Sequence, residues 1–195
     1  MSERPRVGIL ALQGDVEAHA RSLDRAGAEP VEVRTAKELD GLVALVIPGG
    51  ESTTISKGMA RLGLFEPIRE LAGAGTPILG TCAGAILLAK RVENHRVATL
   101  ELLDVTAVRN AYGTQVDSFA ATADPGVGGD LDGLRCVFIR APRLRDPGPG
   151  VEVLLRVDGE PVLVREGRIL AATFHPELTS DLRVHRALLA LAGSG

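Results

Sequence analysis

The chain has 195 residues, of which 45 % are hydrophobic and 24 % charged, so its composition is that of a folded protein and excludes a disordered chain. Its formal net charge of −3 gives no positive field for nucleic acid or anionic lipid, and 3 % aromatic residues argue against stacking platforms for bases. The length suits one domain over residues 1–195. Because no apolar run approaches the ~20 residues of a membrane-spanning helix, no export signal is recognisable and two cysteines cannot build a disulfide framework, we expect a cytoplasmic protein.

The first half of the chain alternates short apolar strands with helices. Residues 7–12 and 42–47 are nearly continuous apolar runs, typical of strands that are covered on both faces in a parallel sheet. Residues 15–27 carry apolar side chains at helical spacing and end at a glycine. Further strands are predicted over 31–33 and 77–80, and further helices over 53–62, 65–72 and 84–90. This alternation predicts a doubly wound α/β sheet.

The half after residue 94 consists mainly of short segments with β character. They span residues 100–109, 115–121, 136–139, 151–157, 161–164 and 168–174. Glu166 and Gly167 have the sequence of a hairpin turn, and residues 181–191 return to helical spacing. We therefore predict antiparallel extensions to a mostly parallel central sheet, closed by a C-terminal helix.

Gly80-Thr81-Cys82-Ala83-Gly84 joins a predicted strand to a predicted helix. This is the G-x-S-x-G nucleophile-elbow pattern with sulfur in place of oxygen, in which the glycines let the central side chain project from a strained turn. The N-terminus of the following helix favours a thiolate. An inert buried side chain is the alternative, and it is our interpretation of Cys136. The pattern predicts that Cys82 is a nucleophile.

Phe174-His175-Pro176-Glu177 follows the apolar run 169–173. Proline disfavours helical backbone at the residue before it, so the segment is extended and residues two positions apart point to one side. His175 and Glu177 would then share a face, where the carboxylate can orient the imidazole as a base for a thiol. A strand-end histidine beside an ordinary surface carboxylate is the alternative. His19 and His185 lie on apolar faces of predicted helices and are expected to be structural.

Pro48-Gly49-Gly50-Glu51-Ser52-Thr53-Thr54 stands at the carboxyl end of a predicted strand, where ligands bind in open α/β sheets. Paired glycines let backbone N–H groups approach a ligand closely, as an oxyanion hole requires. A glycine turn followed by a Ser/Thr helix N-cap is the alternative. The phosphate-loop pattern is not met around Lys57, and CxxC and HExxH spacings are missing from the sequence. We expect neither a metal nor a cofactor.

Together, the cysteine turn, the histidine–proline–glutamate segment and the glycine pair resemble class I glutamine amidotransferases. Further blocks resemble one branch of that family, the glutaminase subunits of pyridoxal 5′-phosphate synthase. In chain order the blocks are Ala11-Leu12-Gln13-Gly14, residues 48–54, residues 80–84, Arg109-Asn110, residues 115–119, residues 138–142 and residues 174–179. Since they cover nearly the whole chain, the resemblance implies a three-layer α/β/α, flavodoxin-like fold in one glutaminase domain.

The resemblance implies hydrolysis of L-glutamine to glutamate and ammonia. Cys82 would attack the side-chain amide and form a γ-glutamyl thioester, while His175, oriented by Glu177, would move the proton to the leaving ammonia. Backbone N–H groups of Gly50 and Ala83 would bind the oxyanion. The family positions around the substrate match Gly50, Glu51, Ser52, Arg109, Ile139 and Arg140. Either arginine suits the α-carboxylate of glutamine, and without the resemblance both would be interpreted as solvated surface residues.

The resemblance also implies a partner, a (β/α)8-barrel pyridoxal 5′-phosphate synthase subunit that receives the ammonia. We expect Gln13 to link docking of that partner to the oxyanion loop at residues 49–50; a polar residue that closes a buried strand is the alternative. Two other functions remain open for the whole chain. One is a γ-glutamyl hydrolase or the glutaminase of another amidotransferase, and the other is a non-catalytic binding or regulatory domain.

Overall fold

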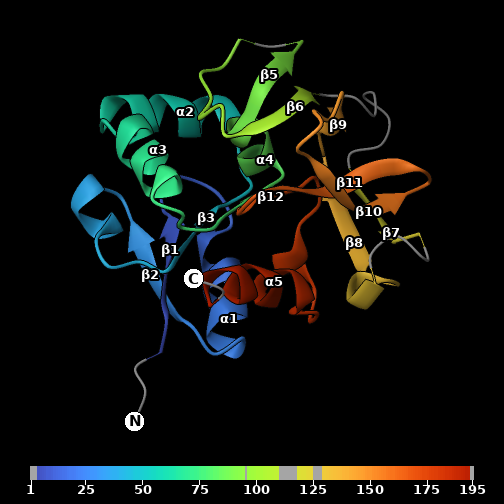
Figure 1. The fold of residues 1–195 in the computed structure, drawn as a ribbon, viewed down its shortest axis with the longest axis horizontal. Coiled ribbons are helices and arrows are strands. Elements are labelled where there is room, and N and C mark those ends of the chain that lie inside the picture. The colour runs from blue at the N-terminus through green and yellow to red at the C-terminus, as the bar shows by residue number, and fades with distance from the viewer. Residues whose placement is uncertain (1–3, 95, 110–117, 125–128, 194–195) are drawn as a thin grey trace.

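The computed structural model describes residues 4–94, 96–109, 118–124 and 129–193 and has a seven-stranded sheet at its centre (Figure 1). The strand order is β10-β11-β12-β4-β3-β1-β2. These strands are β1 (Arg6–Leu10), β2 (Glu29–Val33), β3 (Ala44–Ile47), β4 (Ile78–Thr81), β10 (Glu152–Val157), β11 (Glu160–Glu166) and β12 (Ile169–Ala172). All pairings from β12 to β2 are parallel, while β10 and β11 extend the sheet in antiparallel fashion. The predicted mostly parallel sheet with antiparallel extensions is confirmed.

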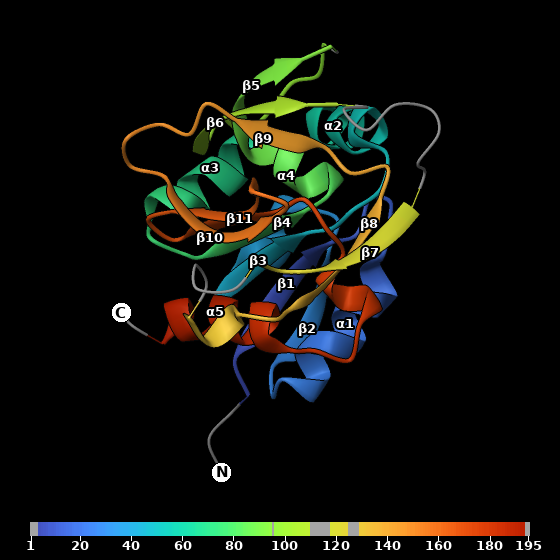
Figure 2. The same cartoon turned by 90° about the vertical axis from the view of Figure 1, so that its right-hand side faces the viewer.

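Helices cover both faces of this sheet, which makes three layers (Figures 1 and 2). One face carries α1 (Val16–Arg25) and α5 (Arg183–Ala192); the other carries α2 (Ser52–Arg61), α3 (Phe65–Gly73) and α4 (Ala83–Leu88). Alternate residues of β3 pack to opposite sides, because Val46 joins the core cluster that contains Leu23 of α1 and Leu45 joins the one that contains Met59 of α2. Short 3-10 helices are η1 (Ala36–Leu39), η2 (Gly129–Leu131) and η3 (Pro176–Leu178).

Two small sheets stand beside the main one. The first contains β5 (Ala89–Glu93), β6 (Leu103–Val108) and β9 (Arg143–Arg145), and the second contains β7 (Ser118–Thr122) and β8 (Arg135–Ile139). The helix predicted over 84–90 is too long, since it ends at Leu88 and the chain continues directly into β5. The pairing of β5 with β6 overrides the local helix propensity of this segment. Asn110 and residues 115–117, which carry part of the family resemblance, lie outside the described residues.

The topology brings four loops to one edge of the sheet. Strands β12, β4, β3 and β1 are adjacent and parallel, so their carboxyl ends meet at that edge. His175 follows β12, Cys82 follows β4, Glu51 follows β3 and Gln13 follows β1. Residues as far apart in the sequence as Gln13 and His175 are therefore assembled into one place. Within the described residues, no helix has the length and apolarity that a membrane crossing requires.

Candidate active site

Cys82 stands on a strained turn between β4 and α4. Its φ of 49° and ψ of −105° lie in a region that side chains other than glycine rarely adopt. The backbone is held in this shape because Cys82 N–H donates to Ala172 O of β12 at 2.8 Å. Cys82 is 7 % exposed, and its Sγ lies 3.6 Å from the carbonyl oxygen of Ile139, to which the thiol can donate. Such a turn places the sulfur beyond the carboxyl end of β4 rather than among the side chains of the core.

The two glycines of the cysteine turn permit close packing on either side of it. A Cβ on Gly84 would lie 2.0 Å from Ile47 O, and a Cβ on Gly80 would lie 2.6 Å from the Gly84 backbone. Neither contact is possible for a real side chain, so α4 can pack this closely on β3 and β4 only with glycine at both positions. The spacing that predicted a nucleophile elbow thus has a steric cause in the fold.

His175 and Glu177 form a buried pair beside this turn. His175 Nδ1 lies 2.7 Å from Glu177 Oε1, and both side chains are almost completely buried. Asp15 Oδ2 is 3.5 Å from the same nitrogen. Burial alone would lower the pKa of His175, but interactions with Cys82 and Glu177 outweigh it and raise the pKa to about 10. Nε2 has no hydrogen-bond partner among the described residues, so it is free to exchange a proton with a thiol or a substrate.

Gly49 lies between the imidazole and the cysteine. A Cβ at this position would come within 2.6 Å of His175 Cε1 and within 3.3 Å of Cys82 Cβ. Any side chain here would displace the imidazole, so the glycine allows the two reactive groups to approach one another. Ligand sites in proteins are commonly ~300–1,000 Å³, and the cavity that opens above these groups has a volume of about 370 Å³.

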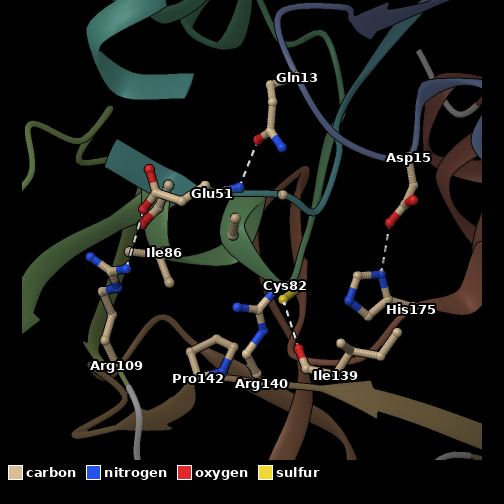
Figure 3. A pocket seen from close by; sticks show the side chains of 13 residues that line it. Gln13, Asp15, Glu51, Cys82, Ile86, Arg109, Ile139, Arg140, Pro142 and His175 are labelled. Carbon is tan, nitrogen blue, oxygen red and sulfur yellow. Dashed lines mark hydrogen bonds and ion pairs between the residues drawn. The ribbon is translucent and has the colours of Figure 1, made fainter. Parts of the chain in front are cut away.

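The cavity brings together nearly all the residues that the sequence singled out (Figure 3). It is lined by Gln13, Gly50, Glu51, Ser52, Cys82, Ala83, Arg109, Ile139, Arg140 and His175. Glu177 is the exception, because it stands behind His175 and is completely shielded. Ser52 Oγ is buried without a hydrogen-bond partner among the described residues, so a polar ligand atom can satisfy it.

Glu51 and Arg109 supply opposite charges to the cavity wall. Arg109 Nη2 lies 3.3 Å from Glu51 Oε1. Glu51 is also the N-cap of α2, where it accepts hydrogen bonds from the N–H groups of Thr53 and Thr54. Burial acts to raise the pKa of Glu51, but these hydrogen bonds outweigh it and lower the pKa to about 2. The carboxylate therefore stays charged, and the helix cap is Glu51 rather than a serine or threonine.

Gln13 connects the loop after β1 to the glycine loop after β3. Its Oε1 accepts a hydrogen bond from Glu51 N at 2.7 Å. The next residue, Gly14, has a φ of 107°, and a Cβ there would lie 1.7 Å from Gly49 O. Asp15 N–H donates to that same oxygen at 3.4 Å. A displacement of residues 13–15 would therefore act directly on residues 49–51.

Sequence reasoning missed several groups at this site. Asp15, Ile86 and Pro142 also line the cavity. Asp15, His175 and Glu177 each offer an atom of a metal-ligating type within 4.8 Å of the others, a grouping unlike the CxxC and HExxH spacings. The proximity of Asp15 to Gln13 in the sequence was the available signal for that residue. Pro142 lies in the block 138–142 that carries the family resemblance, whereas Ile86 gave no signal, because its chemistry is unremarkable and only the fold places it here.

Comparison with protein families assigns the chain. The model of the SNO glutamine amidotransferase family matches residues 9–191. The chain belongs to this family. The match includes every residue of the site described above, and the expected three-layer amidotransferase fold agrees with it.

Individual members of the family are similar over nearly their full length. A protein of Desulforudis audaxviator named pyridoxal 5′-phosphate synthase subunit PdxT is 51 % identical over 94 % of this chain and 97 % of its own length. Its namesake from Acidothermus cellulolyticus is 52 % identical over 99 % of this chain and 96 % of its own. A crystal structure described as a glutamine amidotransferase superposes with a TM-score of 0.91, at 48 % identity and 96 % and 98 % coverage of the two chains. Sequence and fold thus point to the same amidotransferase branch.

Proposed function

We propose that this chain is the glutaminase subunit of a pyridoxal 5′-phosphate synthase, acting as one glutaminase domain over residues 1–195. It hydrolyses L-glutamine to glutamate and ammonia for a synthase partner. The observation that carries the proposal is the placement of Cys82 and His175 against Gly49 on the floor of one cavity, with Glu177 on the far nitrogen of the imidazole. Relatives about half identical to this chain that are named as subunits of that synthase support the choice of pathway.

The reaction begins with proton transfer from the Cys82 thiol to His175 Nε2. The sulfur attacks the side-chain amide carbon of glutamine, and His175 then gives the proton to the amide nitrogen as the C–N bond breaks and ammonia leaves. The γ-glutamyl thioester that remains on Cys82 is cleaved by water, which loses a proton to His175 and releases glutamate and the thiol. Glu177 holds the imidazole through Nδ1, so Nε2 stays directed at the reacting atoms.

Two backbone groups are suited to stabilise the negative oxygen that forms in each step. Ala83 is the first residue of α4, and its N–H is among those that have no partner inside the helix. Gly50 follows Gly49 next to the sulfur, and the Gly49 carbonyl is turned toward Asp15. Because the N–H of a trans peptide points away from its carbonyl, the Gly50 N–H is directed away from Asp15. We assign both N–H groups to the oxyanion hole.

The charged groups of the wall suit the two ends of free glutamine. The α-ammonium requires an anion, which Glu51 supplies, and the α-carboxylate requires a cation, which Arg109 and Arg140 can supply. Arg109 already shares its charge with Glu51, whereas Arg140 has no ion pair within the described part of the chain. We therefore assign the α-carboxylate of glutamine to Arg140 in preference to Arg109. The buried Ser52 hydroxyl and the Ile139 carbonyl complete the polar surface beside the scissile amide.

The partner that we propose is a (β/α)8-barrel synthase subunit. Ammonia released into water near neutral pH is mostly protonated and no longer nucleophilic, so a glutaminase gains by acting only when docked on the enzyme that consumes the product. The contacts of Gln13 and Gly14 with residues 49–51 give docking a direct route to the oxyanion loop. The cytoplasmic location expected from the sequence fits this role and remains a prediction.

The decisive experiment measures ammonium and glutamate released from L-glutamine by the chain alone and with a pyridoxal 5′-phosphate synthase barrel subunit. We expect little release from the chain alone and a large increase when the partner is added, with Cys82→Ala inactive in both cases. Full activity that ignores the synthase would favour a free γ-glutamyl hydrolase. No glutamine hydrolysis under either condition would favour a non-catalytic domain.

A further inference from the structure

Behind the His175–Glu177 pair lies a second set of polar side chains that the proposed reaction does not use. His19 of α1, Thr81 of β4 and His185 of α5 are all 0 % exposed. His19 Nδ1 lies 3.0 Å from His185 Nε2, and His19 Nε2 lies 3.1 Å from Thr81 Oγ1. The same His19 Nε2 is 3.3 Å from Glu177 Oε2. Side chains from the three elements thus form a continuous polar network that ends on the Glu177 carboxylate.

The positions of the protons in this polar network follow from which atoms have hydrogen-bond partners. His185 Nδ1 has no hydrogen-bond partner within the residues that the structure describes. A buried N–H without an acceptor is rarer in proteins than an unused lone pair, so we assign the His185 proton to Nε2, where it is donated to His19 Nδ1. His19 Nδ1 is then an acceptor. The proton of a neutral His19 consequently lies on Nε2, facing Thr81 and Glu177.

The opposite tautomers are disfavoured at both ends of the polar network. It would leave the His185 Nδ1–H without an acceptor, and it would turn a lone pair of His19 Nε2 toward the Glu177 carboxylate at 3.3 Å. Burial lowers the pKa of both histidines, that of His185 to about 4, so both rings are neutral near pH 7. A neutral ring can offer its Nε2–H to the carboxylate without adding a buried charge.

Glu177 needs such a donor. Oε1 is occupied by His175, but Oε2 is buried and has no conventional hydrogen bond to any described residue. An unsolvated carboxylate oxygen is costly, and a carboxylate held through one oxygen alone can rotate away from its partner. His19 Nε2, 3.3 Å away, carries a proton toward this oxygen.

We propose that His19 is a positioning residue of the glutaminase, which shares its Nε2–H between Thr81 and Glu177 Oε2 and so holds the carboxylate on His175, while His185 sets the tautomer of His19. This inference rests on the proposed function and deepens it. His19 does not line the cavity, so it does not touch the substrate and acts on the base through Glu177. The relay runs from His185 of α5 through His19 of α1 to Glu177 and His175 at η3, across three elements of the fold.

Two amide substitutions separate the donor from the bulk of the ring. In His19→Gln the side-chain amide nitrogen can occupy the place of Nε2, whereas in His19→Asn it reaches only the place of Nδ1. We expect His19→Asn to lower kcat about tenfold or more with KM changed less than about twofold, because a hydrogen bond to a charged group is lost away from the substrate. His19→Gln should recover most of kcat. Equal kcat values in the two variants would show that His19 only fills space.

The pH dependence of Cys82 alkylation by iodoacetamide provides a readout that does not involve glutamine. His175 is faced by Glu177, Asp15 and Cys82, and Glu177 is faced by His19. When Glu177 is held less firmly, the protonated form of His175 is less stable and favours the Cys82 thiolate less. The pH of half-maximal alkylation should therefore rise by about one unit in His19→Asn and stay unchanged in His19→Gln. Leu23→Ala, also fully buried on α1, is the control that should reduce the melting temperature without moving this pH.

NMR of the wild-type protein labelled with 15N at histidine tests the assignment without any substitution. We expect the Nε2–H tautomer for both His19 and His185, and an Nδ1–H tautomer of His19 would overturn the proposal even if every variant failed to fold. Alkylation and NMR need no glutaminase activity. A wild-type chain that releases no ammonium with the synthase would therefore contradict the proposed function, while the alkylation and NMR results would still decide whether the relay exists.

Discussion

His175 Nδ1 lies 2.7 Å from Glu177 Oε1, and Pro176 is the residue between them. His175 has a φ of −106° and a ψ of 87°, and Pro176 opens the short 3-10 helix η3 that carries Glu177 inward. The prediction that the whole segment is extended is therefore wrong, although the predicted pairing of His175 with Glu177 is present. His175 N–H is also anchored to Val137 O of β8 at 2.8 Å. The local chain and the neighbouring strand thus set the base and its carboxylate in one rigid unit.

The first prediction concerns the two cysteines. Cys82→Ala should abolish glutamine hydrolysis, because the thioester cannot form, whereas Cys136→Ala should leave it largely intact. Burial raises the pKa of Cys136 to about 12, with a smaller contribution from Asp181, so its thiol stays protonated. A glutamine analogue with an electrophilic carbon should label Cys82 alone, as read by peptide mass spectrometry. Labelling of Cys136 at a comparable rate would contradict the assignment.

The second prediction separates the base from its carboxylate. His175→Ala should lower kcat about a hundredfold or more, and Glu177→Gln should lower it about tenfold, since the amide keeps the shape but not the charge that favours imidazolium. Adding Glu177→Gln to His175→Ala should cost little more, because the carboxylate acts only through the imidazole. Steady-state rates of the three variants with the synthase present provide the check. Small and additive losses would indicate a merely structural pair.

The third prediction concerns the link between docking and the oxyanion loop. Gln13→Leu removes the acceptor of the Glu51 N–H and should abolish the increase in activity on addition of the synthase. The reactivity of Cys82 toward iodoacetamide should persist, since the cysteine turn is held by its own contacts. Gln13→Glu, which keeps an acceptor oxygen at the same reach, is the matched control. An unaltered response of Gln13→Leu to the partner would remove this residue from activation.

The fourth prediction concerns stability in acid. The folded-state pKa of His185 is lowered to about 4 by burial, while an unfolded histidine titrates near ~6.5. The unfolded chain therefore binds more protons than the folded one below that pH, so the stability present near pH 7 is lost as the pH falls from ~6.5 toward 4. His185 alone accounts for about 3 kcal/mol of this loss, and His19 adds to it in the same direction.

Urea unfolding across this pH range provides the measurement for acid stability. The free energy of unfolding of the wild type should decrease steadily, and the His185→Leu variant should show a flatter dependence because one proton-binding site is removed from the unfolded state. His175 does not disturb the comparison. Its raised pKa of about 10 contributes stability that is fully present below ~6.5 and is lost only as the pH rises. Parallel curves for wild type and variant would contradict the account.

The class of fold and the kind of chemistry follow from patterns that are local in the sequence. Apolar runs such as 42–47 signalled a buried parallel strand, and the glycines around Cys82 signalled a strained turn, because both patterns act over a few neighbouring residues. The hydrogen bond between His175 and Glu177 belongs to the same category, since it spans one proline. The local pattern gave the wrong end for α4, because pairing with β6 makes residues 89–93 a strand.

Which distant groups meet depends on how the strands and helices pack together. The strand order places β1 two strands from β4, which puts Asp15 on His175 and His19 on Glu177 and Thr81, and it brings His185 of the last helix onto His19. In the sequence, His19 and His185 were two histidines on apolar helix faces with no visible partner. Their role depends on contacts between residues 166 positions apart, and no local pattern encodes such contacts, because they arise when buried polar atoms must satisfy one another after the layers have packed.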